Sequence, residues 1–564
     1  MKRTGLNSPG ILAGIVVMLG YAASAHAQIS EARIQELIKQ AADRAAIGAG
    51  QTPQTQAPGD PRPVVPLTLE DAVKFALDRN LDIAVQRLNP EISDIAIASI
   101  RSAYRPLVSS TISGAGLSQL PTSQLIGGSN VVQDTQTING ALTQGVPWGG
   151  GSLAVSLSNF RQTSTSNNVL YNPTIQSVWQ GTYTQPLLRG FRTDSTRRQL
   201  VVTKVSRDIS DVQLRATITN TVSNVRSAYW DYVFAVQSVD VAQQSVTLAE
   251  QLVKDNQTRV EVGTMAPIDV VQAQSQAATA RQNLAVALQT RDTAELALKR
   301  LIVNGTQDTN WSARLDPVDR PDFHPETIDV ESAVRRALSE RTDLDIARKN
   351  VTQNDATFKY LRDQLLPQSD FQATYGLAGI GGIQYQRNST QLGATPVIVP
   401  GGIGDTFGSL FGSNYPRWTF ALNFSYPLGQ SSQEASVARA RVQMNQINAQ
   451  VKQIELQVAT DVTNAAITAK SNVDRVQAAQ AARELAQKQL EAEQSKFEVG
   501  MSTNYNVIQS QRDLATAQTN ELQAVLNYRK SLVELDRLQQ TTLQSLSITV
   551  LSPTAAGTIT IAPQ

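Results

Sequence analysis

Cysteine is absent from the 564 residues of this chain, and histidine occurs only twice. The lack of cysteine excludes disulfides, thiolate nucleophiles and cysteine-ligated metals. It also excludes a lipid anchor on an N-terminal cysteine. We find no paired acids at catalytic spacing, no Ser-His-Asp set and no phosphate-binding loop. We therefore expect no enzyme, no cofactor and no metal site.

A surplus of one charge is also missing, since 49 Lys and Arg face 48 Asp and Glu. A nucleic-acid-binding protein usually carries a clustered basic surface, so we expect no nucleic-acid partner. Aromatic residues make up only 5% of the chain, which is low for a globular enzyme of this size. Ala, Gln, Val, Thr and Ser fill the space instead, as is typical of long helices packed in thin layers.

Long hydrophobic runs are lacking as well, and none reaches the ~20 residues of a membrane-spanning helix. The apolar run at residues 11–20 follows Lys2 and Arg3 and precedes Ala25-His26-Ala27. This order is typical of a secretory signal peptide with a small-residue cleavage site. We predict that residues 1–27 are removed before Gln28, so that the protein is exported and not lipid-anchored.

What the chain does contain is an internal repetition. Val260-Glu261-Val262-Gly263 returns as Phe497-Glu498-Val499-Gly500, and the segment 269–274 returns as 506–511. Both shifts are 237 residues, from 263 to 500 and from 272 to 509. Two similar repeats therefore replace the three to four domains that length alone would suggest. The segments that we predict are a short helix and proline-rich linker at 28–66, repeat 1 at 67–304, an inter-repeat linker at 305–326, repeat 2 at 327–545 and a tail at 546–564.

Each repeat combines helical and strand patterns. A first helix ends near Pro106 or Pro367, and after the strands a helical pattern runs from about 193 to 259 or from about 433 to 496. About 65 helical residues make a rod of ~100 Å. Heptad-spaced residues predict the packing seams of these rods. The seam residues are Val222, Val225, Tyr229, Tyr232, Val236, Val239, Gln243 and Val246 in the first rod, and Val462, Ala466, Ala469, Val473 and Val476 in the second.

The strand patterns alternate between apolar and polar residues with period 2. The apolar set includes six aromatic residues that we predict to face the membrane, namely Trp179, Tyr183, Trp418, Phe420, Phe424 and Tyr426. A soluble β-sandwich would bury this face, whereas a membrane barrel would turn it to lipid and line the lumen with Thr, Asn and Ser. The export signal, the absence of an apolar helix and the long helical rods favour the barrel.

The number of strands predicts an oligomer. Two clear strands in each repeat give four per chain, and single-chain membrane barrels begin at about eight. Open strand edges are not tolerated in lipid, so several chains would share one barrel. A possible extra hairpin lies around residues 147–151. We interpret it as a lengthened outer loop, with additional wall strands as the alternative.

The two Val-Gly turns lie at the far end of the rods from the strands. Gly263 and Gly500 are expected to be left-handed C-caps between antiparallel helices, each preceded by a valine, Val262 or Val499. The far end of a tube is where it would be closed or where a partner would dock.

These features together resemble the TolC-like outer-membrane efflux proteins. The resemblance is carried by the two turns with their Asp/Asn-Val-x-Gln sequels, by the repeat starts ending in Pro106 and Pro367, and by the segment 185–191, and it covers residues 67–543. It implies a mainly α fold with membrane β: a homotrimer whose 12-stranded outer-membrane β-barrel continues as a long periplasmic α-helical barrel.

The resemblance also implies a function and partners. Such a channel is the exit duct of a tripartite efflux or type I secretion system and is gated at its periplasmic tip. An adaptor protein docks near the tip and joins it to an inner-membrane pump of the resistance-nodulation-division or ABC type. The alternative is a periplasmic coiled-coil scaffold or adaptor without a membrane barrel.

The second tip departs from the pattern of the family, which places two carboxylates just after the turn. The matching positions here are Asn506 and Gln509, whereas Asp269 in repeat 1 does match an acidic position. Phe497 stands where the family often has a tyrosine of the gating network, and Ser502 replaces a basic partner. The candidates for the pore constriction are Asp269, Gln272, Asn506, Gln509 and Phe497. We predict a closed tip that is held less by ion pairs and traps cations weakly.

Overall fold

The computed structural model of the chain describes residues 62–121, 130–166, 168–320, 323–386, 397–429 and 431–548. The chain divides into two units, Met1–Arg62 and Pro63–Gln564, and every element named below belongs to the second. The predicted signal peptide, the predicted helix near the N-terminus and the tail beyond residue 548 lie outside the described residues.

The helices of the two halves have equal lengths, pair by pair. In each half a helix of 11 residues precedes one of 22, and after the strands a helix of 67 precedes one of 36. The first set is α2 (Leu69–Arg79), α3 (Leu81–Ser102), α4 (Ser195–Glu261) and α5 (Pro267–Ile302); the second is α7 (Val330–Glu340), α8 (Thr342–Asp363), α10 (Ser432–Glu498) and α11 (Asn504–Gln539). The long rods begin and end within two residues of their predicted limits. No helix in these described ranges is both long enough and apolar enough to cross a membrane.

Capping residues explain where the helices begin. Thr68 Oγ1 accepts the Asp71 amide at 3.1 Å, and Asp194 Oδ1 accepts the Arg197 amide at 2.6 Å. Ser431 and Glu434 form a reciprocal capping box at the start of α10. Each cap satisfies amide donors that the first turn of a helix leaves unpaired.

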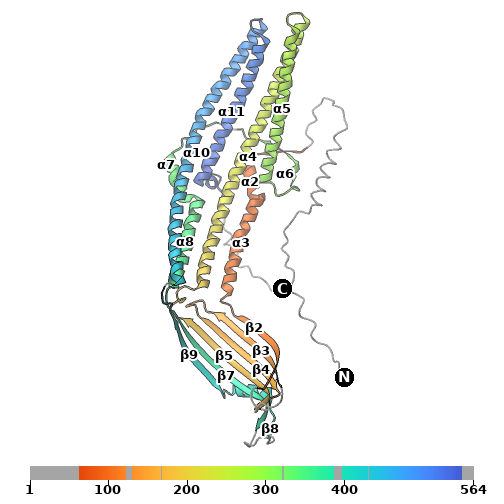
Figure 1. Ribbon diagram of the computed structural model, residues 1–564. Coiled ribbons are helices and arrows are strands. Elements are labelled where there is room, and N and C mark those ends of the chain that lie inside the picture. Colours follow the sequence, from red (N-terminus) through yellow and green to blue (C-terminus); the bar gives the residue numbers. More distant parts are fainter. Residues whose placement is uncertain are drawn as a thin grey trace, which may run out of the picture. The chain divides into compact units, whose positions relative to one another are not determined.

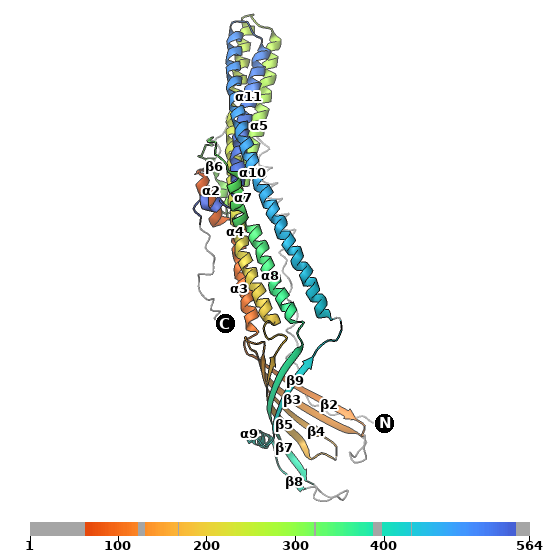
Figure 2. The same ribbon diagram turned by 90° about the vertical axis from the view of Figure 1, so that its left-hand side faces the viewer.

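Four helices pack side by side in one row, with α3 against α4, α4 against α8 and α8 against α10 (Figures 1 and 2). Beyond this row α4 and α5 form one hairpin and α10 and α11 form another, and α11 packs against α4. Most of the predicted seam residues are buried here. The fully buried ones include Val222, Val225, Tyr229, Val462, Ala469 and Val476.

A belt of short elements packs beside the middle of α4. Strand β1 (Val64–Leu67) pairs in parallel with β6 (Arg314–Pro317), which follows the short helix α6 (Thr309–Ser312), and the short helix α12 (Thr542–Ser545) contacts α4 as well. The predicted inter-repeat linker therefore contains structure of its own. Tyr229 Oη donates to Leu67 O at 3.0 Å, and burial raises the pKa of this hydroxyl above its ordinary value. The buried tyrosine thus fastens β1 to α4.

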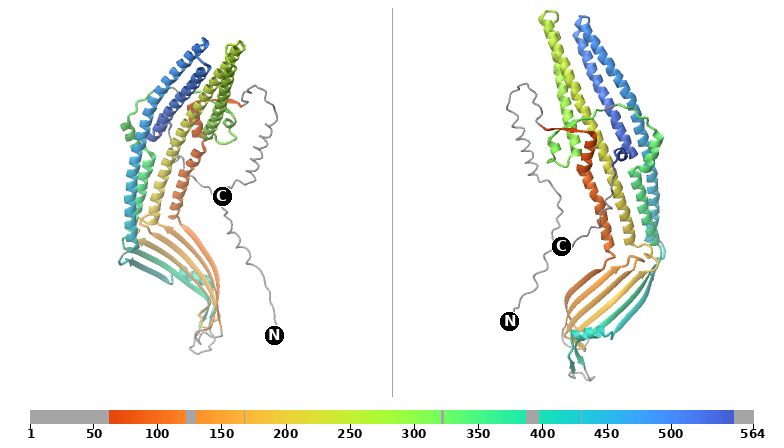
Figure 3. Two further views of the ribbon diagram at one scale, coloured as in Figure 1. Left: turned by 45° about the horizontal axis from the view of Figure 1, so that its top comes forward. Right: turned by 180° about the vertical axis from the view of Figure 1, so that it is seen from behind.

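Seven strands form one antiparallel sheet at the end of the helical row that lies away from the turns of the two long hairpins (Figure 3). Its order is β2-β3-β4-β5-β7-β8, with β9 paired to β7. The strands are β2 (Leu107–Gln119), β3 (Val131–Gly145), β4 (Ser152–Ser164), β5 (Tyr171–Pro186), β7 (Gln368–Gln386), β8 (Val397–Val399) and β9 (Pro416–Ser425). The six long strands, without β8, are called the strand wall below.

The prediction of four strands per chain is wrong, because repeat 1 contributes four long strands and repeat 2 contributes two. The hairpin around residues 147–151 does not belong to an outer loop. Its turn lies at the helix end of the sheet, where Gln144 Nε2 donates to Tyr104 O at 3.4 Å. The alternative, extra wall strands, is correct. Strands β2 and β3 are rich in Ser, Thr and Gly, so their alternation of polarity is weak in the sequence.

A short helix, α9 (Ile403–Phe411), packs on β7 and β5 toward their ends away from the long helices (Figure 2). It is seated on Gly379 and Gly381. A Cβ added at Gly379 would lie 2.9 Å from Ser409 Oγ and 3.0 Å from Leu410 Cβ. Glycine is therefore required for this close approach of helix and strand.

Candidate functional site: the strand wall and the helical tips

The strand wall has one continuous apolar face. Directly paired residues of neighbouring strands point to the same side of a sheet, and the register places Leu142 beside Val155, Leu157 beside Trp179, and Tyr375 beside Trp418. The apolar face collects Val108, Ile112, Ile138, Leu142, Leu153, Val155, Leu157, Trp179, Tyr183, Phe371, Tyr375, Leu377, Trp418, Phe420, Leu422 and Phe424. All six strands contribute to it, including β3 and β4.

Five of the six predicted membrane-facing aromatics lie on this face, and Tyr426 follows the end of β9. Trp418, Phe420 and Phe424 are 70%, 66% and 65% exposed. Exposed apolar patches of this extent mark a surface that meets lipid or protein. Tyr183 Oη donates to Gln185 Oε1 at 2.6 Å, so its polar end is satisfied near the helix end of the sheet.

The opposite face of the strand wall is mainly polar. Thr182 and Thr374 face each other at 3.3 Å there. The same face carries Thr111, Thr137, Asn139, Ser156, Gln180, Gln372, Thr419 and Asn423. Within the described ranges the other sheet is the β1–β6 pair of the belt, so no second layer of a sandwich covers either face. A polar face opposite an apolar one is the pattern of a membrane barrel wall.

Tip 1 (residues 262–266, between α4 and α5) and tip 2 (residues 499–503, between α10 and α11) have the same backbone. Gly263 and Gly500 have φ of 75° and 79°. Thr264 N donates to Arg259 O at 2.9 Å, and Met501 N donates to Lys496 O at 2.8 Å. Both turns are therefore Schellman C-caps, as predicted. Val262 and Val499 are each 68% exposed and project at the outer limit of the hairpins.

Three contacts near the tips join the hairpins to each other, and in one of them Asn504 Nδ2 on α11 donates to Asp269 O on α5 at 3.1 Å. Asn256 Nδ2 on α4 donates to Asn504 Oδ1 on α11 at 2.9 Å. Arg259 donates to Phe497 O at 3.1 Å and lies 4.5 Å above the centre of the Phe497 ring. These contacts use amides, a carbonyl, an arginine and a π face, so no carboxylate takes part in them.

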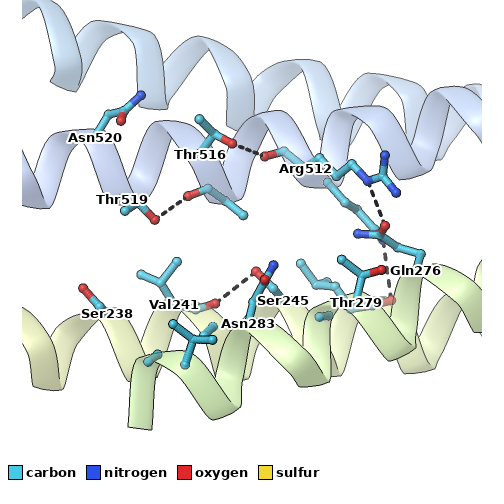
Figure 4. A pocket seen from close by; sticks show the side chains of 17 residues that line it. Ser238, Val241, Ser245, Gln276, Thr279, Asn283, Arg512, Thr516, Thr519 and Asn520 are labelled. Carbon is cyan, nitrogen blue, oxygen red and sulfur yellow. Dashed lines mark hydrogen bonds between the residues drawn. The ribbon is translucent and has the colours of Figure 1, made fainter. Parts of the chain in front are cut away.

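Further from the turns, another contact spans the hairpins, since Arg512 Nε on α11 donates to Gln276 Oε1 on α5 at 2.8 Å. It lies at one end of a groove of about 580 Å³ between α11 and the α4–α5 hairpin (Figure 4). Small and polar side chains line this groove, including Ser238, Ser245, Thr279, Asn283, Thr516 and Thr519.

Tip 2 also has a network of its own. Glu493 accepts from Lys496 Nζ and from Ser502 Oγ, each at 2.7 Å, and Asn506 Nδ2 donates to Ser502 Oγ at 3.3 Å. The hydrogen bonds from Lys496 and then from Ser502 hold the pKa of the Glu493 carboxyl below its usual value. Ser502, which replaces a basic residue of the family, is thus a bridge between a carboxylate and an amide.

The structure separates the predicted constriction residues into two groups. Gln272, Asn506 and Gln509 are exposed, and Asp269 is half-buried. Phe497 is only 7% exposed and packs with Leu252, Leu490, Val507, Ile508 and Leu514. Its ring therefore helps to hold the hairpins together and does not lie on an open surface of this chain.

Sequence reasoning missed Asp513, which accepts from Gln509 Nε2 at 2.8 Å. It stands seven residues beyond Asn506, two helical turns along the same side of α11. The signal was the spacing, because Asn506, Gln509 and Asp513 follow at intervals of three and four. This side of α11 has amides at the two positions where the family has carboxylates, but it carries one carboxylate further along the helix, at Asp513.

A strand wall with one apolar face, continued by long paired helices that end in two matching turns, defines an outer-membrane channel of the efflux type. The family model of the outer membrane efflux protein matches residues 152–304 and 333–539, more than half of the chain. The chain belongs to this family. The family consists of channels and not of enzymes, so the expectations of a TolC-like protein and of no enzymatic activity are confirmed.

Solved structures of outer-membrane channels share the fold. The CmeC channel of Campylobacter jejuni matches with a TM-score of 0.60 at 14% identity, over 85% of this chain and 89% of that one. The open state of the MtrE channel of Neisseria gonorrhoeae matches with a TM-score of 0.57 at 16% identity, over 87% and 95%. VceC of Vibrio cholerae matches with a TM-score of 0.59 at 12% identity, over 84% and 95%. A sequence comparison with curated proteins gave no match.

Proposed function

We propose that this protein is the outer-membrane exit duct of a tripartite efflux or type I secretion system. It acts as a homotrimer, is exported by its signal peptide without a lipid anchor, and extends from the outer membrane into the periplasm. The observation that carries the proposal is the strand wall. Its apolar face spans all six strands, and each end of the helical row runs directly into it.

The hairpin tips support docking of a periplasmic adaptor that links the duct to an inner-membrane pump of the resistance-nodulation-division or ABC type. Exposed apolar residues cluster around the turns, namely Val262, Ile268, Val499, Met501 and Tyr505. The groove of Figure 4 lies further along the same hairpins. Apolar anchors beside a helix-lined groove fit a helical partner.

The tips also support gating by contacts other than ion pairs. Asn256–Asn504 and Arg259–Phe497 hold the two hairpins together without a carboxylate. Asp269, Gln272, Asn506 and Gln509 remain the candidates for the constriction, and two of the positions at tip 2 are neutral amides. Cation block of the closed channel should therefore be weaker than in a pore with two acidic rings.

Single-channel recording in planar bilayers tests the duct, with the mass of the detergent-purified oligomer measured in parallel. A trimer with small, stable conductance is expected. A soluble species that needs no detergent and gives no conductance would instead establish the periplasmic scaffold.

Neighbouring residues of β9 supply a matched pair for the same test. Phe420→Lys places a charge on the apolar face, and Thr419→Lys places it on the polar face. A cation on the lipid side of a barrel costs about 2–4 kcal/mol near the midplane. Phe420→Lys should therefore lower the yield of heat-resistant trimer, whereas Thr419→Lys should keep the trimer and change only ion selectivity. Equal effects of the two substitutions would contradict a lipid-facing apolar surface.

A further inference from the structure

The order of the helices and the order of the strands agree except at one place. Along the helical row the order is α3, α4, α8, α10. Helix α3 leads into β2, β5 leads into α4, α8 leads into β7, and β9 leads into α10. The corresponding strands stand in the order β2, β5, β7, β9, but the β3–β4 hairpin is inserted between β2 and β5. In the described part of the chain, this hairpin is the portion of the strand wall that no helix of the row continues.

The inserted hairpin is fully built into the strand wall. It forms 13 register pairs with β2 and 11 with β5. Its turn is held at the helix end, because Gln185 Nε2 donates to Gly149 O at 2.7 Å. Gly149 and Gly150 have φ of 67° and 68°, and a Cβ on Gly150 would lie 2.6 Å from Gly190 O. The segment 185–191, noted in the sequence for its resemblance to the family, thus positions this turn.

The hairpin makes the strand wall as broad as the helical row. Four helices with axes about 8–10 Å apart span roughly 32–40 Å. Six strands about 4.8 Å apart and tilted by about 40° span roughly 38 Å, whereas four would span only roughly 25 Å. The two layers of one chain therefore match at their junction only when β3 and β4 are included.

Both edges of the strand wall and both outer helices of the row offer surfaces for another copy of the chain. In the described residues β2 pairs only with β3 and β9 only with β7, so each has an open edge. Above β2, α3 exposes Val85, Leu88, Ile92 and Ile95 at heptad spacing. Above β9, α10 exposes Val442, Leu456 and Ile467, each close to a whole number of turns apart. Open edges in lipid must be paired, and two different edges close a ring head to tail.

We infer that three copies join β2 to β9 and close a barrel of eighteen strands, six from each copy. This inference rests on the proposed function and replaces the twelve-stranded barrel. Its diameter between backbones would be roughly 36 Å, against roughly 24 Å for twelve strands, since diameter grows about linearly with strand number. The exit then does not narrow at the outer membrane, and the helical tips are the narrowest part of the path. Cargo size is set at the tips and not by the barrel.

Electron cryo-microscopy of the full-length protein in lipid nanodiscs tests the inference directly. A threefold ring of eighteen strands is the expected result. A threefold ring of twelve strands with β3–β4 outside the barrel, or a twofold ring of twelve strands, would overturn it while leaving a membrane channel. Absence of any barrel would contradict the proposed function itself, so the two failures are distinct.

Engineered cysteines give a second test, which is free of background because the chain has none of its own. Thr111→Cys on β2 and Thr419→Cys on β9, with Ser109, Ser113 and Asn423 as alternative positions for unknown register, should cross-link between copies into dimers and trimers on denaturing gels. As a control, Thr182→Cys on β5 with Thr419→Cys should give no such ladder, because β7 lies between these strands. Cross-linking of Thr111→Cys to Thr182→Cys within one chain would show β2 beside β5 and contradict the six-stranded wall.

Removal of residues 131–164 tests the functional consequence. It deletes β3 and β4 and leaves β2 and β5 as a hairpin. The cross-section of the barrel should fall about twofold, measured by exclusion of neutral polymers added from the barrel side to a channel held in a bilayer. An unchanged polymer cut-off in a folded, conducting deletion variant would overturn the inference. If the variant does not fold, the cysteine test decides.

Discussion

The two halves of the chain share their helix lengths, but equivalent residues near their tips have different hydrogen-bond partners. At a shift of 237 residues, Asn256 corresponds to Glu493, Arg259 to Lys496 and Gln276 to Asp513. The three residues of the first half all reach across to the other hairpin. Glu493, Lys496 and Asp513 bond instead within their own hairpin. The second half reaches across as well, through Asn504 and Arg512, but its residues at these three positions only stiffen their own hairpin. The Asn256–Asn504 and Arg259–Phe497 contacts are called the latch of tip 1 below.

The strand regions of the two halves diverge more than the helices do. The first half adds the β3–β4 hairpin, and the second adds α9 on the surface of the sheet. Helices that must fill one row side by side share a common length, because a longer one would project past its neighbours. A sheet can accept another hairpin at little cost, since each new strand pairs with the last. Divergence is therefore confined to where the architecture tolerates it.

The largest expected effect on stability comes from the C-terminal end of α5, where the first half has a buried ion pair. Lys299 Nζ lies 2.8 Å from Glu295 Oε1, and both side chains are almost fully buried. The corresponding residues of the second half are Leu532 and Asp536. Lys299→Met removes the ammonium that faces Glu295 and that donates to Trp311 O and Ala313 O. It should cost about 3–5 kcal/mol, seen as a large drop in melting temperature.

Two variants control this experiment. Glu295→Leu combined with Lys299→Met removes both charges and should recover part of the loss, although Leu315 N then loses its acceptor. Arg335→Ala breaks an exposed pair with Glu331 and should change stability by about 0.5 kcal/mol or less. A melting temperature as low for the double variant as for Lys299→Met would show that packing, and not the pair, is responsible.

The next effect concerns α9, the addition of the second half. Gly379→Val puts a side chain where Ser409 and Leu410 now lie, and should cost about 1–3 kcal/mol by overpacking. Limited proteolysis should then cut residues 403–411 faster. Gly404→Ala is the matched control, because a Cβ there meets nothing within 4 Å. Equal protease sensitivity of both variants would show that the packing of α9 does not depend on glycine at position 379.

The sequence predicted the helices and tips well because their signals are local. Apolar spacing, capping residues and the glycine after each rod are read from adjacent positions. The prediction that the aromatic residues of β9 share one face of the strand was also correct, since they alternate strictly with other residues. Strand β2 was missed because Ser, Thr and Gly occupy so many of its positions. The β1–β6 pair was missed because it joins segments about 250 residues apart.

The candidate site was predicted only in part for the same reason. Gly263 and Gly500 were found by repetition, but the Asn256–Asn504 bond joins residues whose meeting depends on tertiary packing. A usable signal was present, since Asn256 and Glu493 differ in charge at equivalent positions. Phe497 was predicted as a constriction candidate, and its burial in a cluster could not be foreseen from the sequence pattern alone.

The contrast between the tips predicts unequal effects of two matched substitutions. Arg259→Gln removes the hydrogen bond to Phe497 O and the cation–π contact, together worth about 1–2 kcal/mol. The open probability of single channels should rise roughly 5- to 30-fold. Lys496→Gln, at the equivalent position, removes only a contact within its own hairpin and should change the open probability less than about twofold. Similar increases for both would mean that Arg259 and Lys496 contribute equally to holding the hairpins together.

The smallest effect follows from the pH dependence of tip 2. Hydrogen bonds from Lys496 and Ser502 lower the pKa of Glu493, so the charged form is favoured in the folded state. The resulting stabilisation is present above the ordinary pKa of a glutamate and is lost as pH falls through the lowered value. Acid should therefore speed hydrogen exchange at residues 499–506, and Glu493→Gln should show the faster exchange already at neutral pH. The latch of tip 1 contains no carboxylate, so the open probability should stay nearly constant over the same pH range. An acid-induced rise in open probability that Glu493→Gln abolishes would place the latch in tip 2 and reverse the assignment of roles to the two halves.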